Sequence, residues 1–423
     1  MKHTLIMKAH YILPLLIFCS FCRYAAFAQV NMHDSTEFNK ITQIVNAIKH
    51  QYAPDSRTAL FELQATGGTP QRQYTVITTE AEALPVLQRR LADQHIDNTK
   101  ITINLLPDNS VGKNVSGVVN LSVAELRVTP SNQAELASQI LLGTTIDLLA
   151  HNGEYYRART PEGYIAWIKA ASITPMTATE TAAWKSAEKV IFTADFGHAY
   201  SHPDSRSLRV SDLVMGNILK VTGQAGGFYQ VQYPDGRQAY IEEGLALPFD
   251  EWLGTRKVTA DSILAIAKSM MGVPYVWGGT SVKGVDCSGF TKTAYFMNGI
   301  IIPRDASQQV LAGQPLDILT DGVLDTDKAL RNLKPADLLF FASGSGRSPD
   351  ARITHVALYL GNGEFIQSAG TVRINSMLPG AANYSDFRTR TLVAARRYIG
   401  QDDPNLQAVA TNRFYFPTTE NQP

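Results

Sequence analysis

The stretch Asp286-Cys287-Ser288-Gly289-Phe290 decides how the C-terminal part of this 423-residue chain folds. Apolar residues continue from it at positions 290, 294 and 297, a spacing that predicts a helix. Asp286 is a suitable N-cap and Gly299 a suitable stop, so Cys287 falls in the first turn. Unpaired N–H groups and the helix dipole favour a thiolate there, which lowers the thiol pKa from its free value of ~8.5. Cys287 is therefore a candidate nucleophile, with an inert core cysteine as the alternative.

The only histidine after residue 202 is His355. It lies in an alternating, strand-like run over residues 353–360. A thiolate that attacks an amide needs a proton carrier for the leaving amine, and histidine suits this role near neutral pH. A lone histidine on a strand is more often a satisfied core group, but His355 is the sole candidate in its domain. We therefore expect it to be the base.

A third polar residue follows on the next predicted strand. A base of this kind is oriented by a group that accepts from its other ring nitrogen. Residues 361–363 indicate a hairpin turn, and Gln367 lies beyond it. A three-residue loop or a bulge would set Gln367 diagonally from His355 on the same face, whereas a plain two-residue loop would separate them. We predict the longer loop or a bulge, with an ordinary strand-end polar residue as the alternative.

Charge and composition exclude several classes of function. The chain has 38 basic and 38 acidic residues and hence no net charge to hold DNA or an anionic membrane. The C-terminal domain lacks the His or Cys pairs that zinc requires, and no Gly-rich strand-to-helix motif indicates a nucleotide. We expect no metal, no cofactor, no nucleic-acid partner and a monomer.

The N-terminus predicts export. Basic residues precede an apolar run over residues 11–21, and Ala26-Phe27-Ala28 fits a cleavage site, so residues 1–28 are expected to be a signal peptide. The run is short for a stable membrane span, and Pro14 interrupts it. A lipid anchor at Cys22 is the alternative. Cleavage after residue 28 would leave Cys287 as the only cysteine, in a periplasmic or extracellular enzyme.

The middle of the chain repeats at an offset of 73 residues. Gly143, Pro161 and Gly163 recur as Gly216, Pro234 and Gly236 among other matches. Short β-rich runs with Gly and Pro-x-Gly turns predict two copies of a small barrel. Among the positions where the copies diverge, Glu135 aligns with Leu208 and Tyr164 with Arg237. Such divergence indicates a special role in one copy, or ordinary drift.

These segments resemble the NlpC family of papain-like cysteine peptidases, which cut peptide stems of bacterial cell walls. The likeness covers residues 260–400, through the runs 275–279, 286–290, 303–309 and 354–363. The family often has histidine where this chain has Gln367. Four-part members of the family are also similar in organisation. The resemblance therefore implies an α+β multidomain chain: a small N-terminal α+β domain (29–113), two SH3-like barrels (114–178 and 179–252) and a papain-like peptidase domain (253–423).

The resemblance also implies a substrate and its contacts. Similar enzymes cleave between γ-D-glutamate and lysine or diaminopimelate, in stems with a free N-terminal L-alanine. Glu135 and Tyr164 of the first barrel match positions that bind this amine, and Asp305 matches a carboxylate facing it, with a salt bridge to Arg304 as its alternative role. Tyr275 is expected to meet the oxyanion, or simply to pack. Trp277 and Ser288 complete the predicted substrate-binding set.

We therefore expect a secreted thiol peptidase of cell-wall turnover that hydrolyses the γ-D-glutamyl–L-diamino acid bond of peptidoglycan stem peptides or muropeptides. Cys287 would attack, His355 would carry the proton and Gln367 would orient His355. Two alternatives stay open: a cell-wall binding protein with an inactive peptidase domain, and an acyl transferase that uses the same acyl-enzyme.

Overall fold

The computed structural model describes residues 36–68, 72–344, 352–385 and 389–417. The predicted signal peptide, with Cys19 and Cys22, lies outside these residues. Within the described part of the chain, no helix is long and apolar enough to cross a membrane. The chain divides into two compact units, Met1–Leu106 and Pro107–Pro423, and each is described by itself.

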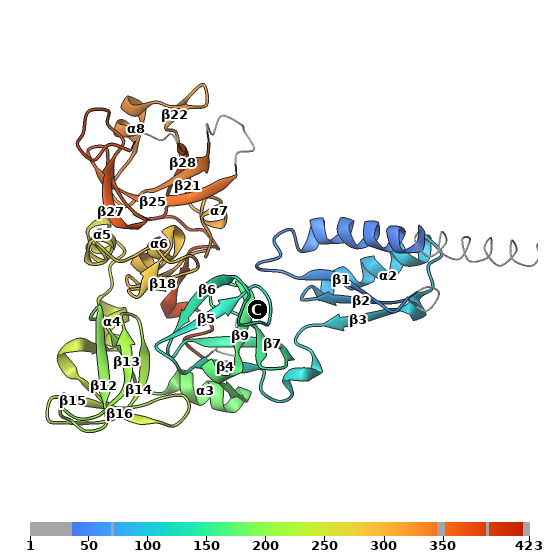
Figure 1. Cartoon of the computed structure of the whole chain (residues 1–423), viewed down its shortest axis with the longest axis horizontal. Helices are drawn as coiled ribbons and strands as arrows, with labels where there is room; N and C mark the ends of the chain where they lie inside the picture. The colour runs from blue at the N-terminus through green and yellow to red at the C-terminus, as the bar shows by residue number, and fades with distance from the viewer. Residues whose placement is uncertain (1–35, 69–71, 345–351, 386–388, 418–423) are drawn as a thin grey trace, which may run out of the picture. The chain divides into compact units, whose positions relative to one another are not determined.

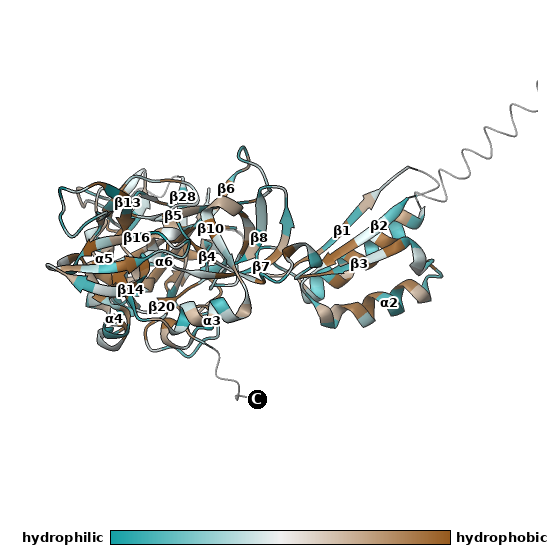
Figure 2. Ribbon diagram, turned by 90° about the horizontal axis from the view of Figure 1, so that it is seen from below, coloured by the Kyte–Doolittle hydropathy of each residue, from teal (hydrophilic) through white to brown (hydrophobic). Residues whose placement is uncertain are grey.

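The first unit is a small α+β domain (Figure 1). A helix over residues 36–52 buries Ile41, Ile44, Val45 and Ile48, the positions whose spacing predicted it. Strand β2 (Gln73–Thr78) pairs with β1 (Phe61–Thr66) antiparallel and with β3 (Ile101–Leu105) parallel. Helix α2 (Leu84–Asp93) carries both hydrophobic and hydrophilic residues along its length (Figure 2) and buries the apolar ones against the same core.

The second unit contains two seven-stranded sheets of identical topology. The first has the order β10-β4-β7-β8-β9-β5-β6 and the second β13-β12-β16-β15-β14-β11-β17, which is the same arrangement read from the other edge. Every strand of the second starts 73 residues after its counterpart; β4 starts at 116 and β11 at 189, for example. The strands are β4 (Ser116–Val119), β5 (Val123–Arg127), β6 (Leu136–Leu141), β7 (Thr145–Asn152), β8 (Tyr155–Arg159), β9 (Ile165–Lys169) and β10 (Ile173–Met176), then β11 (Lys189–Phe192), β12 (Phe196–Tyr200), β13 (Arg209–Val214), β14 (Ile218–Ala225), β15 (Phe228–Gln232), β16 (Gln238–Glu242) and β17 (Ala246–Pro248).

The predicted duplication is therefore confirmed, and we call the two sheets the first and second copy. A glycine that occurs at the equivalent position of both copies lies where the two sheets touch. Gly143 has φ +82°, and a Cβ there would lie 2.0 Å from the main-chain oxygen of Ile218 in the second copy. Only glycine tolerates both that backbone conformation and that approach. The copies are further joined by Asn217, whose side-chain amide donates to the main-chain oxygen of Ser122 at 2.8 Å.

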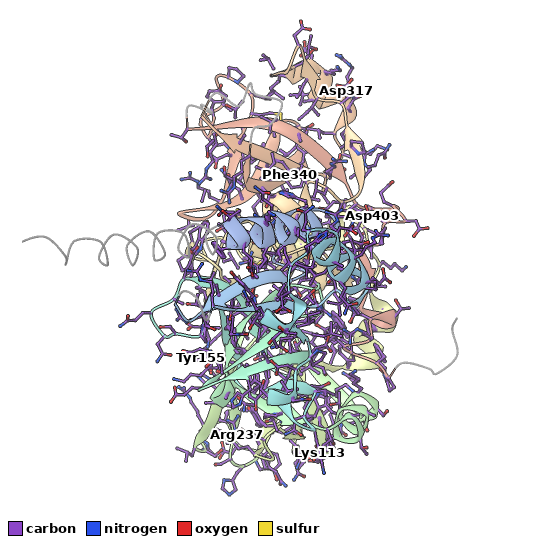
Figure 3. All side chains as sticks on the ribbon, turned by 90° about the vertical axis from the view of Figure 1, so that its right-hand side faces the viewer. Lys113, Tyr155, Arg237, Asp317, Phe340 and Asp403 are labelled. Carbon is purple, nitrogen blue, oxygen red and sulfur yellow. The ribbon has the colours of Figure 1, made fainter. Side chains whose placement is uncertain are left out.

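The C-terminal domain is a six-stranded sheet with helices on both faces, in the order β21-β28-β24-β25-β26-β27. One apolar face packs on α5 and α6 and the other on α8; Phe340, labelled in Figure 3, is buried on the face that packs on α5 and α6. Its main strands are β21 (Gln314–Leu316), β24 (Leu338–Ser343), β25 (Ile353–Gly361), β26 (Glu364–Ala369), β27 (Thr371–Ser376) and β28 (Arg390–Arg397). Its helices are α5 (Ala260–Ser269), α6 (Cys287–Phe296), α7 (Ala306–Gln309) and α8 (Thr326–Asn332); α3 (Ala178–Ser186) and α4 (Phe249–Thr255) follow the first and second copy.

Short two-stranded ladders complete this domain. They pair β18 (Thr280–Ser281) with β19 (Gly284–Val285), β20 (Ile300–Ile301) with β29 (Gln407–Ala408), and β22 (Leu319–Thr320) with β23 (Val323–Leu324). Strand β18 also lies against β6 of the first copy, where the main-chain N–H of Thr280 donates to Gln139 Oε1 at 3.0 Å. The first copy thus contacts the region just before Cys287.

Candidate active site

Cys287 is the first residue of helix α6, as the sequence predicted. Asp286 caps this helix, because its Oδ1 accepts from the Gly289 main-chain N–H at 2.7 Å. The cysteine side chain is 6% exposed and packs within the core that joins α6 to β25. The helix start therefore fixes the sulfur at the junction between α6 and the sheet.

A buried ion pair holds this helix start. Arg304 is 1% exposed, and its Nη2 donates to Asp286 Oδ2 at 2.7 Å while its Nη1 donates to Oδ1 at 3.1 Å. This bidentate geometry is the strong form of an arginine–carboxylate pair. The remaining Arg304 Nε donates to Ser138 Oγ of the first copy at 2.7 Å. The first copy is thus connected to the helix cap before Cys287 through one arginine, and nothing in the sequence marked Ser138 for this role.

The thiol is not activated in the way that its helix position suggested. Burial, and after it the neighbouring Asp286 carboxylate, raise the pKa of Cys287 to about 11. A main-chain hydrogen bond from Val356 and the charge of Arg304 act in the opposite direction without reversing the shift. The prediction of a lowered thiol pKa was wrong for the unliganded enzyme, because removal of the sulfur from water outweighs the helix start. At neutral pH the group is a thiol.

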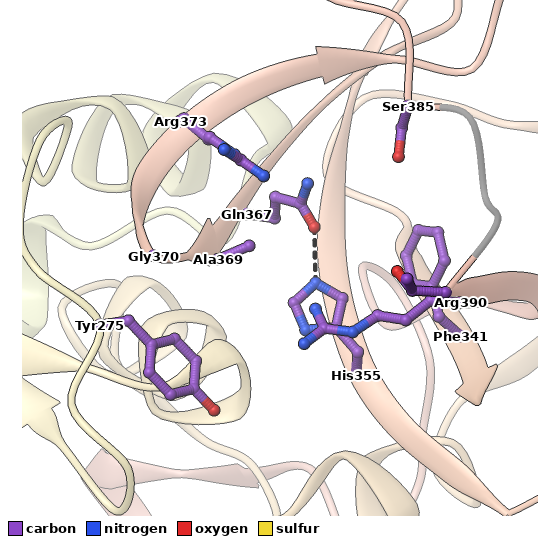
Figure 4. A pocket seen from close by; sticks show the side chains of 10 residues that line it. Tyr275, Phe341, His355, Gln367, Ala369, Gly370, Arg373, Ser385 and Arg390 are labelled. Atoms are coloured by element: carbon purple, nitrogen blue, oxygen red, sulfur yellow. Dashed lines mark hydrogen bonds between the residues drawn. The ribbon is translucent and has the colours of Figure 1, made fainter. Parts of the chain in front are cut away.

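His355 and Gln367 form the predicted pair. Residue Leu358 faces Ile366 and Tyr359 faces Phe365, so the register places Gln367 opposite 357 and diagonal to His355. A bulge between Tyr359 and Gly361 produces this register, which confirms the bulge that the sequence required. The distance from His355 Nε2 to Gln367 Oε1 is 2.6 Å (Figure 4).

A second amide, which no sequence pattern marks, fixes the orientation of Gln367. The side-chain Nε2 of Gln367 donates to Asn375 Oδ1 at 2.8 Å, and Asn375 Nδ2 donates to the main-chain oxygen of Asn383 at 3.0 Å. Since the amide nitrogen is used in this chain, Oε1 is directed at the imidazole and accepts from an N–H at Nε2. The ring nitrogen left to accept a proton is therefore Nδ1. Only a cross-strand contact reveals Asn375, so no local motif could have found it.

The imidazole is neutral at rest. Burial lowers the pKa of His355 to about 3, and the guanidinium groups of Arg390 and Arg373 contribute, while Gln367 and Asp286 oppose the shift. Together with the neutral thiol, this gives a thiol–imidazole pair rather than an ion pair. Sulfur and ring share neighbours: Val356, which bonds the sulfur, follows His355 directly, and Asp286 acts on the pKa of both groups.

Tyr275 lies on the other side of the same space. Its main-chain N–H donates to the Gly370 oxygen at 2.8 Å, and burial together with the nearby Cys287 raises the phenol pKa to about 12. The hydroxyl therefore keeps its proton at neutral pH and can donate to a developing oxyanion.

The first copy supplies two of the predicted binding residues. Trp277 is 61% exposed, and its indole N–H donates to Glu135 Oε1 at 2.8 Å. Tyr164 is buried at 7% exposure, and its phenol lies close enough to Arg304 to act on the pKa of that group. The structure thus brings these residues to the boundary between the first copy and the C-terminal domain. Their binding roles stay predictions.

Asp305 and Ser288 have structural contacts of their own. Asp305 caps α7 in a capping box with Gln308, and its Oδ1 lies 3.9 Å from Arg304 Nη1, the salt bridge that was its alternative role. Ser288 is buried, donates to Asp286 Oδ1 at 3.2 Å and accepts from Arg304 at 2.9 Å. These contacts supply each residue with a supporting function, and substrate binding by either one stays a prediction.

A pocket of about 480 Å³ opens beside the imidazole (Figure 4). Its wall contains the hydrogen-bonded pair of His355 and Gln367, two arginines and several small or aromatic residues; the lining residues are Tyr275, Phe341, His355, Gln367, Ala369, Gly370, Arg373, Ser385, Thr389 and Arg390. Elsewhere, the described residues contain no group of three or more His, Cys, Asp or Glu side chains placed to hold a metal ion.

Comparison with known families identifies the domain that holds this site. The model of the NlpC/P60 family matches residues 272–391, which include Cys287, His355 and Gln367. Residues 272–391 are an NlpC/P60 domain. A second model, the bacterial dipeptidyl-peptidase Sh3 domain, matches residues 126–173 of the first copy. The NlpC/P60 domain and the SH3-like region confirm both the resemblance and the fold class predicted from the sequence.

Curated relatives extend beyond the NlpC/P60 domain. A protein of Bacillus cereus named gamma-D-glutamyl-L-lysine dipeptidyl-peptidase is 29% identical over 281 residues, which cover 64% of this chain and 77% of the relative. Dipeptidyl-peptidase 6 of Lysinibacillus sphaericus is 26% identical over 62% of this chain and 92% of its own length. Among solved structures, an NlpC/P60 family protein from Bacillus cereus superimposes on 67% of this chain and 99% of its own with a TM-score of 0.53 at 24% identity, a similarity of fold.

Proposed function

We propose that this chain is a cysteine endopeptidase that hydrolyses the γ-D-glutamyl–L-diamino acid bond of peptidoglycan stem peptides. One observation carries the proposal: within an NlpC/P60 domain, Cys287 begins helix α6 beside the strand that presents His355 to Gln367. Relatives named gamma-D-glutamyl-L-lysine dipeptidyl-peptidase support the choice of bond.

The neutral thiol–imidazole pair determines the first chemical step. His355 Nδ1 takes the proton from Cys287 as the sulfur attacks the γ-glutamyl carbonyl carbon, so charge separation occurs only with substrate bound. The main-chain N–H of Cys287 and the Tyr275 hydroxyl donate to the oxyanion that forms. The C–N bond then breaks as His355 returns its proton to the leaving amine, and a thioester remains on Cys287.

Hydrolysis of the thioester repeats these steps with water. The imidazole, neutral again, takes a proton from the attacking water, and the protonated ring then gives that proton to the departing sulfur. Gln367 orients the ring throughout, and its amide adds no charge that would stabilise the imidazolium. Gln367 therefore mainly orients the ring, and Asn375 holds the Gln367 side chain in place.

We also propose that the first copy selects stems with a free N-terminal L-alanine. Two carboxylates support this: Glu135, which reaches Trp277 of the NlpC/P60 domain, and Asp305, which is partly exposed beside Arg304. An ammonium group would be favoured near such carboxylates, and an acylated amine would leave them uncompensated. Action outside the cytoplasm, in the periplasm or the medium, fits a cell-wall substrate and the predicted export signal.

The proposal is tested with L-Ala-γ-D-Glu-diaminopimelate and its N-acetylated form, with products identified by mass spectrometry. We expect the dipeptide L-Ala-D-Glu and free diaminopimelate from the first peptide, slow cleavage of the second, and no product with Cys287→Ala. Absence of cleavage by the unmodified enzyme would refute the proposed bond. Addition of an amine acceptor distinguishes hydrolysis from acyl transfer, because a transferase would yield the amide of the dipeptide instead of the free acid.

A further inference from the structure

The pocket beside His355 carries an unusual concentration of positive charge. Two of its ten lining residues, Arg373 and Arg390, are arginines, and none of the ten is acidic. In the part of the chain that the structure describes, neither guanidinium has a hydrogen bond or an ion pair to a protein side chain. Two unpaired cations in one pocket point to an anionic ligand.

Strand register explains why Arg373 faces the reaction centre. Arg373 on β27 is the direct cross-strand partner of Gln367 on β26. Directly opposed residues project from the same face of a sheet, so Arg373 shares the face of the residue that orients the base. Figure 4 shows Arg373 and Gln367 on the same border of the pocket.

Arg390 reaches the pocket from a different strand. It begins β28 and faces Ser343 at the end of β24, next to Phe341, which also lines the pocket. Figure 4 shows its side chain beside the imidazole, and its charge is the strongest of the charges that lower the pKa of His355. The two arginines thus approach His355 from two sides, on strands that are four apart in the sheet order.

The position of the base shows which part of a substrate enters this pocket. His355 must protonate the leaving nitrogen, so the leaving residue has to extend from that nitrogen into space next to the imidazole. No residue of the first copy lines the pocket, whereas Glu135 lies at the boundary with the first copy, where it accepts a hydrogen bond from Trp277. The pocket and the boundary at Glu135 are therefore separate. An extended peptide could place its N-terminal end at Glu135 and its leaving residue in the pocket.

We propose that this pocket binds the leaving diamino acid and selects one whose side chain ends in a carboxylate, as in diaminopimelate, over one that ends in an ammonium, as in lysine. The inference rests on the proposed function. A side-chain carboxylate pairs with a guanidinium, while the lysine ammonium would lie among cations with no lining carboxylate to compensate it. In this preference the chain differs from the substrate stated in the names of its relatives.

The test compares kcat/KM for L-Ala-γ-D-Glu-meso-diaminopimelate and L-Ala-γ-D-Glu-L-lysine. The unmodified enzyme is expected to prefer the first by ~10- to 100-fold, the usual effect of one charge-assisted hydrogen bond. Arg373→Gln and Arg390→Gln are each expected to reduce this ratio, and Arg373→Glu to reduce it further or reverse it. Arg331→Gln, on the exposed side of α8, is the matched control and keeps the ratio.

The possible outcomes separate the two proposals. Equal cleavage of both peptides, or a preference for lysine, overturns the inference and leaves the proposed function intact. Cleavage of neither peptide refutes the proposed function. If the arginine variants lower both rates in parallel and the ratio is unchanged, the arginines support the fold and do not read the leaving residue, which also overturns the inference.

Discussion

The two SH3-like copies share every strand, yet they differ in what the equivalent positions contact. Glu135 of the first copy accepts a hydrogen bond from Trp277 of the NlpC/P60 domain, whereas its counterpart Leu208 is 79% exposed. Tyr164 lies beside Arg304, whereas its counterpart Arg237 donates to the main-chain oxygen of Asn120 in the first copy. Equivalent positions of one shared fold therefore have different surroundings, because the first copy contacts the NlpC/P60 domain through them.

An unchanged residue makes the same point. Ser138 and its counterpart Ser211 are both serines, but Ser138 accepts from the buried Arg304 while Ser211 bonds Tyr233 within its own copy. Identity of sequence at a repeat position thus does not imply identity of role. The first copy contacts the NlpC/P60 domain through both its altered and its conserved positions.

The largest expected difference is between Arg304, which contacts the first copy, and Arg237, which lies in the second copy. Arg304→Met leaves Asp286 as a buried, unpaired carboxylate, and loss of one partner from such a pair costs ~3–5 kcal/mol of stability. The control Arg237→Met removes a partly exposed pair with Asp235 and a hydrogen bond to the main-chain oxygen of Asn120, and it is expected to cost less, ~1–2 kcal/mol. Urea unfolding measures both.

If Arg304→Met does not fold, Arg304→Met combined with Asp286→Asn keeps the helix cap without the unpaired charge, and we expect it to regain part of the loss. Similar costs for the two arginine variants would show that the first copy is not specially connected to the site.

The corresponding serine variants should differ less in free energy of unfolding than the two arginine variants do. Ser138→Ala removes the acceptor for Arg304 Nε in a fully buried position, and an unsatisfied buried donor costs ~1–3 kcal/mol. Ser211→Ala affects a partly exposed hydroxyl, and we expect less than ~1 kcal/mol. Thermal or urea unfolding of both variants, with the unmodified chain as reference, provides the values. A larger loss for Ser211→Ala would contradict the comparison.

The smallest expected effect of a first-copy residue is on the thiol, whose titration we expect to be unaffected by Glu135. Because burial raises the Cys287 pKa to about 11, the thiolate fraction, and with it the rate of iodoacetamide alkylation, should rise about tenfold per unit between pH 6 and 9. Glu135 is not among the groups that act on this pKa, so Glu135→Gln should leave the pH profile unchanged. A rate that is fast and flat across this range would show a thiolate–imidazolium pair and contradict the neutral resting state.

The sequence predicted those features that local pattern encodes. The 73-residue repeat, the helix start at Cys287 and the bulge that aligns His355 with Gln367 follow from spacing, turn residues and strand alternation. The thiol pKa could not be predicted from the helix start, since it depends on how deeply tertiary packing buries the sulfur. Ser138, Asn375 and the arginines of the pocket contact the site across strands or domains, and such contacts have no signature in a single sequence.

The central claim is that the first copy determines which peptide reaches Cys287. The most direct measurement is the ratio of kcat/KM for L-Ala-γ-D-Glu-diaminopimelate to that for its N-acetylated form, in the unmodified enzyme, Glu135→Gln and Leu208→Gln. We expect a high ratio that falls about tenfold or more in Glu135→Gln, as for loss of one charged hydrogen-bond partner, and stays unchanged in Leu208→Gln. Equal cleavage of the two peptides by the unmodified enzyme, or the same ratio in all three proteins, would contradict the claim.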